Sequence, residues 1–184
     1  MNNETVDEIR LGSGELYHMA FTGTIPTHAD IEIATNRTGY IKSGATLEYK
    51  PELKEVFDDL RKVIKTFLVK EDVTFKSGLM TWDLQTLELL SASGTYVDDE
   101  TTHKRTLTLG KAGAIELTQH LFRFVHTKTD GNKFRVTLVA TAQNGFSLAF
   151  KPDDATVIDA ELKAAAHDSD GTLVILEEEY GTAV

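Results

Sequence analysis

A chain of 184 residues is long enough for one domain with a hydrophobic core. It carries 29 acidic and 19 basic residues, a net charge of −10. This acidic balance argues against a protein that binds nucleic acid through a basic surface. The absence of cysteine excludes disulfides, thiolate metal ligands and cysteine nucleophiles. No apolar run reaches the roughly 18 residues of a membrane span. Since the acidic start also lacks the apolar region of a secretory signal, we expect neither a membrane segment nor export.

Short segments rich in Thr, Val, Ile, Leu and Phe, separated by turn residues, predict a mainly β chain. The first four predicted strands are residues 16–21, 45–49, 73–77 and 106–109. Residues 52–68 differ, because their apolar residues recur at the i, i+3, i+4, i+7 spacing of an amphipathic helix. Periodicity alone therefore predicts a helix between the second and third strands.

A second helix is predicted after Asp83. Leucines follow at positions 84, 87 and 90, and Leu89 widens this apolar stripe. Gly94 stands where a helix C-terminus favours a residue of positive φ. We expect a helix of about ten residues that covers one face of the sheet, with Trp82 packed at its start.

The clearest hairpin signal lies at residues 121–126 and 134–139, which alternate and flank Asp130-Gly131. Residues 146–150 could extend this meander as a third strand. Residues 156–162 and 172–176 bracket a turn at Asp168-Ser-Asp-Gly171 and predict another antiparallel pair. About eight strands in all are enough for a sandwich or a barrel.

Catalytic and metal-binding patterns are weak. The turn at 168–171 resembles the opening of a calcium loop, but the acids at 177–179 are misplaced for the bidentate ligand. Six histidines are scattered, and His120 and His126 do not have metal-site spacing. Because no convergent set of complementary polar groups can be assembled, we predict a non-enzymatic protein without cofactor or metal.

Several segments in order resemble the major tail protein (tail tube) family of long-tailed bacteriophages that infect Gram-positive bacteria. The similar segments are residues 6–17 (VDEIRLGSGELY), 21–26 (FTGTIP), 36–51 (NRTGYIKSGATLEYKP), 73–82 (VTFKSGLMTW), 145–150 (GFSLAF), 157–161 (VIDAE) and 170–173 (DGTL). They occur in order along most of the chain, from residue 6 to residue 173. The match is weak at 52–68 and 95–118. For residues 52–68 the resemblance favours an extended, hairpin-like excursion, which we adopt over the helix.

The resemblance implies a phage tail-tube fold, two packed antiparallel sheets (a sandwich or partial barrel) with one flanking α-helix. Residues 1–184 would form a single domain with an N-terminal arm at about 1–14, the excursion at about 51–68, and a C-terminal arm at about 177–184. Six such subunits form a ring, and stacked rings form a hollow tube with a β-barrel lumen that conducts the genome into the host cell. The protein would be made in the bacterial cytoplasm and end in the virion tail.

The implied partners are further copies of the chain, a tape-measure protein, and tail terminator and distal tail proteins. DNA would pass through the lumen without specific binding, which the acidic balance fits because like charges repel phosphates. Alternation sends every second strand residue into such a lumen. Candidate lumen-facing acids are Glu116, Asp159 and Glu161. Two alternatives are the inner tube of a contractile tail or phage-derived bacteriocin, and a soluble β-sandwich module that binds a ligand.

Overall fold

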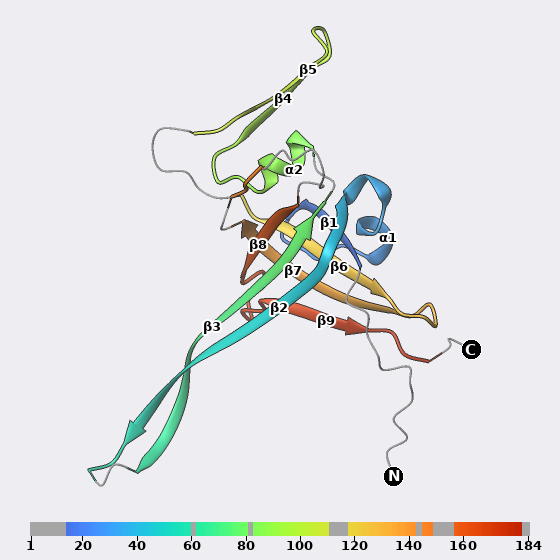
Figure 1. Ribbon diagram of the computed structural model, residues 1–184. Helices are drawn as coiled ribbons and strands as arrows, with labels where there is room; N and C mark the ends of the chain where they lie inside the picture. The colour runs from blue at the N-terminus through green and yellow to red at the C-terminus, as the bar shows by residue number, and fades with distance from the viewer. Residues whose placement is uncertain are drawn as a thin grey trace.

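The computed structural model (Figure 1) describes residues 14–59, 62–80, 83–110, 118–142, 145–148 and 157–181. It is mainly antiparallel β, as predicted. Its helical elements are α1 (His28–Ile31), the 3-10 turn η2 (Ala34–Asn36) and α2 (Leu84–Leu89). Its strands are β1 (Glu15–Ala20), β2 (Arg37–Phe57), β3 (Val63–Leu79), β4 (Thr95–Asp99), β5 (Lys104–Thr108), β6 (His120–Thr127), β7 (Lys133–Ala142), β8 (Ile158–Ala165) and β9 (Val174–Glu178).

The main sheet closes on itself. Its strand order is β6-β1-β2-β3-β8-β7-β9, and β6 also pairs with β7, so six of the seven strands form a ring. The seventh, β9, pairs with β7 over Phe134–Leu138, and β8 pairs with the next stretch of the same edge, Val139–Ala142. Strands β4 and β5 form a separate hairpin that projects beyond α2 (Figure 1). The architecture is compatible with the sandwich or partial barrel that the sequence predicts.

Two apolar clusters stabilise the ring. The larger lies inside it and includes Phe75, Phe122, Leu138 and Ile158, each no more than 1% exposed. The smaller lies on the opposite face of β1, β6 and β7, where Ile31 of the α1 segment covers residues such as Tyr17, Leu121, Val125 and Val139. Strands β6 and β7 are therefore buried on both faces, which explains their near-continuous apolar sequence.

The hairpin β6–β7 is confirmed at the predicted place. Thr127 pairs with Lys133, and Gly131 in the turn has φ +89°. The Lys128 amide donates to the Asn132 carbonyl at 2.8 Å, which closes the turn. Asp130-Gly131 thus provides the backbone conformation that a tight antiparallel turn requires.

Helix α2 begins as predicted and ends earlier. The Asp83 carboxylate accepts a hydrogen bond from the Thr86 amide at 2.8 Å, the usual N-terminal cap. The helix ends at Leu89, after six residues, so the prediction of about ten residues closed by Gly94 was wrong. Gly94 instead donates its amide to Ser91 Oγ at 2.9 Å, and a Cβ there would lie 2.1 Å from that oxygen. Trp82 lies outside the described residues.

The predicted pairing of 156–162 with 172–176 was also wrong. Both segments are largely strands, but β8 and β9 follow one another along the same edge of β7 and therefore cannot lie side by side. The turn at 168–171 exists, since Asp168 Oδ1 accepts from the Thr172 amide at 2.8 Å and Gly171 has φ +81°. Residues 145–148 are not a strand, and 149–150 lie outside the described residues.

Candidate functional site

The longest feature outside the ring is a hairpin arm, defined here as residues 51–70. Strands β2 and β3 continue into it, and it projects well beyond the other strands (Figure 1). It occupies the segment with helical periodicity. Of its described residues, 51–59 and 62–70, all except Asp58 are exposed.

The hairpin arm carries eight large apolar side chains that are between 42% and 66% exposed: Leu53, Val56, Phe57, Val63, Ile64, Phe67, Leu68 and Val69. Single exposed apolar residues are ordinary on a monomer, but eight on one hairpin are unusual and make the arm a candidate interaction surface. The Lys65 ammonium lies 4.7 Å from the ring centroid of Phe67, a cation–π contact that leaves this side chain 44% exposed.

One apolar face of the arm continues the inside of the ring. Leu47, which packs against the inner cluster, pairs with Phe75, and Tyr49 pairs with Val73. Cross-strand partners share a face, and alternate residues of one strand return to it. On this face β2 continues with Leu53, paired with Leu68, after a shift of register. The inner face of the ring therefore continues onto the arm, where the apolar pairs Leu53–Leu68 and Phe57–Val63 alternate with pairs that contain Glu71 and Glu55.

The opposite face of β2, β3 and β8 is polar. Asp159 and Glu161 alternate on β8 with the buried Ile158, Ala160 and Leu162, so both acids point outward. Both were predicted to face a lumen, and they lie on the same outward side of β8. Glu116, the third candidate, lies outside the described residues.

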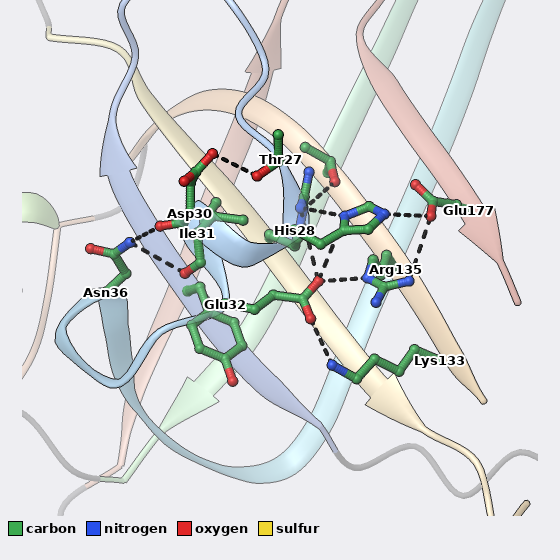
Figure 2. A network of polar contacts seen from close by, with 12 residues as sticks. Thr27, His28, Asp30, Ile31, Glu32, Asn36, Lys133, Arg135 and Glu177 are labelled. Carbon is green, nitrogen blue, oxygen red and sulfur yellow. Dashed lines mark hydrogen bonds and ion pairs between the residues drawn. The ribbon is translucent and has the colours of Figure 1, made fainter. Parts of the chain in front are cut away.

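A buried ion network joins the segment around α1 to β6, β7 and the end of β9 (Figure 2). Glu32, whose side chain is 7% exposed, accepts from Arg135 Nε and from Lys133 Nζ at 2.7 Å. Burial opposes the charged form of Glu32, but the bonds and charges of Arg135 and Lys133 outweigh it, so the pKa of this carboxyl is lowered. Arg135 also donates to Glu179 Oε1 at 2.6 Å, which fixes the chain beyond β9.

His28 extends the network. The Arg123 guanidinium, 3% exposed, donates to His28 Nδ1 at 2.9 Å and to Thr137 Oγ1 at 2.9 Å. Because a guanidinium can only donate, Nδ1 is the accepting nitrogen, and Nε2 carries the hydrogen that faces Glu177 at 2.9 Å. Sequence reasoning missed this network. The available signal was the presence of arginines inside two apolar runs, while their partners are distant in sequence.

A cavity of about 440 Å³ lies between α2 and the ends of β1 and β6. His18, His120 and Glu88 are among its lining residues. Burial lowers the pKa of His120 and, with the added positive charge of His120, lowers that of His18 to about 4. Both rings are thus neutral at ordinary pH, and within the described residues no three potential ligands are placed to hold a metal ion.

In comparisons with known proteins, no protein-family model and no curated protein matches this chain. In the described part of the chain no helix is long and apolar enough to cross a membrane.

Proposed function

We propose that this chain is a structural subunit that assembles with copies of itself into a hollow tube, as the subunits of phage tail tubes do. The observation that carries the proposal is the hairpin arm, with eight exposed apolar side chains at the end of a stable ring. Fully burying one such side chain contributes roughly 1.5–3 kcal/mol. Covering even half of the group in a neighbouring copy would therefore give a substantial driving force for association.

The position of the arm favours open-ended assembly. The arm projects from one end of the subunit (Figure 1), and we infer that its acceptor on a second copy is a different surface. Such head-to-tail contacts repeat along an axis and build rings or filaments, whereas self-complementary contacts stop at a dimer.

Backbone groups of the arm support the same proposal. Strand β2 pairs with β1 only at Arg37–Tyr40, and β3 pairs with β8 only at Thr74–Leu79. Among the described residues, the outer edges of the arm thus have no strand beside them. Unpaired edges favour pairing with another chain, and closing strands of several copies into one barrel would use them. The resemblance to tail tube proteins makes six copies per ring the expected number.

The experiment that tests the proposal compares Phe57→Asp with Val97→Asp. Val97 lies on β4 and is 54% exposed, against 53% for Phe57, so the two substitutions place a charge at equally exposed apolar positions. We expect wild type and Val97→Asp to form rings or tubes at rising concentration, seen by sedimentation velocity and negative-stain microscopy. Phe57→Asp should remain a folded monomer. A wild-type protein that is monomeric at every concentration would refute the proposal.

The second candidate is a ligand-binding module, and the cavity beside α2 is the observation that favours it. A binding module would stay small in the same sedimentation experiment. Its ligand should also protect Gln85 and Glu88, which line the cavity, from hydrogen exchange. The arm remains unexplained in that case, so we favour assembly.

A further inference from the structure

The outward face of β2, β3 and β8 holds charges of both signs in alternation, and we name it the paired-charge face. Its lysines are Lys42, Lys50, Lys70, Lys76 and Lys163. Its acids are Glu48, Glu52, Asp72, Asp159 and Glu161. The remaining outward positions in these rows are threonine or glycine, as at Thr46, Thr74 and Gly78. No apolar side chain lies among them.

Contacts between these charges run across three strands. Lys76 of β3 lies between Glu48 of β2, at 3.8 Å, and Glu161 of β8, at 3.7 Å. Glu48 also contacts Lys50 at 2.7 Å. The hydrogen bond from Lys50, with its charge, lowers the pKa of Glu48.

In a second group of contacts, an acid lies between two lysines. Asp72 of β3 lies between Lys70, at 2.6 Å, and Lys163 of β8, at 3.2 Å. Both lysines lower the pKa of Asp72, chiefly by hydrogen bonding. Exposed ion pairs of this kind contribute about 0–1 kcal/mol each, so stability does not account for the pattern.

The face differs in charge from the rest of the molecule. Five lysines and five acids give +5 − 5 = 0. The whole chain carries −10, so the remainder carries −10 − 0 = −10. A surface that is nearly neutral because its charges are paired neither attracts nor repels a polyanion strongly.

We propose that the paired-charge face is the wall along which a nucleic-acid duplex slides, an inference that rests on the tube proposed above. Interface cores are depleted of charged residues, so a face made only of charged and small residues stays wet in an assembly. In the described part of the chain no helix covers it, whereas the opposite side, over β1, β6 and β7, is covered by the α1 segment. A smooth bore needs strands without such cover.

The shape of the face agrees with a wall. Its hollow of about 350 Å³ lies where Gly78 separates Lys42 from Asp159, and it is shallow and open. A Cβ at Gly78 would come within 2.6 Å of the Lys42 carbonyl oxygen, so this row requires a glycine. Phosphates passing over the paired-charge face would meet lysines already engaged by carboxylates, namely Lys50, Lys70, Lys76 and Lys163.

The first test locates the face in assembled material. The chain has no cysteine, so Asp159→Cys provides one thiol, and Val97→Cys on the β4–β5 hairpin is the matched control. In tubes we expect Asp159→Cys to react with a small maleimide and to exclude a large polyethylene glycol maleimide, while dissociated subunits react with both. Reaction of the tube with the large reagent would place the face outside, and reaction with neither would place it between subunits. Either result overturns the inference.

The second test unbalances the charges. Glu48→Gln with Glu161→Gln removes both carboxylates that contact Lys76, and Asp98→Asn is the control because it releases Arg105 on the distant hairpin. Tubes of the double variant should protect short duplex DNA from nuclease several-fold more than wild type, and added salt should abolish this protection. Equal protection by the control, or none by the double variant, would overturn the inference. Failure of wild type to form tubes would instead refute the proposed function.

Discussion

Acid is expected to destabilise the ring through His18. The imidazole lies on the inner side of β1, with its centroid 6.4 Å from that of Phe122 and its Nδ1 3.0 Å from Thr38 Oγ1. Burial, and next the positive charge that His120 would add, lower the pKa of His18 from 6.5 to about 4. The folded protein therefore binds fewer protons than the unfolded chain between these values.

The direction and the size of the pH effect on stability follow from this difference in bound protons. A folded-state pKa below the unfolded value means that stability is greatest above about pH 6.5 and falls as the pH drops towards 4. At about 1.4 kcal/mol per unit, a shift from 6.5 to about 4 corresponds to roughly 3 kcal/mol in full. Around 2 kcal/mol of this should be lost by about pH 5, before most carboxyl groups titrate.

The assay is urea unfolding of wild type and His18→Gln, at concentrations where sedimentation shows monomer, from about pH 7 to about pH 5. Gln retains a polar partner for the buried Thr38 hydroxyl and removes the titration. The wild-type free energy of unfolding should fall by about 2 kcal/mol more than that of the variant. His103→Gln, at the exposed tip of the β4–β5 hairpin, should behave as wild type. Parallel pH profiles for wild type and His18→Gln would refute the reasoning.

Three further substitutions test the fold. Arg135→Met should cost roughly 3–5 kcal/mol in urea unfolding, because it leaves Glu32 buried beside fewer cations, and adding Glu32→Gln should recover part of the loss. Gly131→Ala should cost about 1 kcal/mol, because φ is +89° and no atom lies near the new Cβ; a larger loss would indicate a contact. Asp83→Ala should cost about 1 kcal/mol by removing the α2 cap, and Asp83→Asn should retain most of it.

Local features of the sequence predicted the local features of the fold. The β6–β7 hairpin follows from two apolar, strand-forming runs around Asp130-Gly131, since all the information lies within about 20 neighbouring residues. The start of α2 follows in the same way from Asp83. Gly94 misled the prediction of its end, because a glycine can be required by a close approach as well as by positive φ.

The hairpin arm was ambiguous for a physical reason. Its helical spacing arises because the register of β2 and β3 shifts between Glu52 and Leu53 and again between Val56 and Phe57. Each shift changes which residues share a face, and apolar side chains then lie on both faces of the arm. A strict period of two is lost, and the remaining pattern resembles a period of 3.6.

Contacts distant in sequence could not be predicted. Nothing in the segments at 156–162 and 172–176 indicates that β7 is the common partner of both, because any alternating run pairs acceptably with another. Arg123 and Arg135 are visible in the sequence, but Glu32 is 103 positions from Arg135. The placement of Asp159 and Glu161 on one outward face needed only their spacing of two.

Both proposals depend on the alternation of the same two strands. Within the ring, β2 and β3 turn Leu47 and Phe75 inward and Glu48 and Lys76 outward. A slip of one residue would exchange these sets and place apolar side chains on the proposed wall. The register shift between Glu52 and Leu53 falls between the last charged pair, Glu52–Lys70, and the first apolar pair of the arm, Leu53–Leu68. One irregularity in the hairpin thus separates a surface suited to sliding from a surface suited to binding another copy.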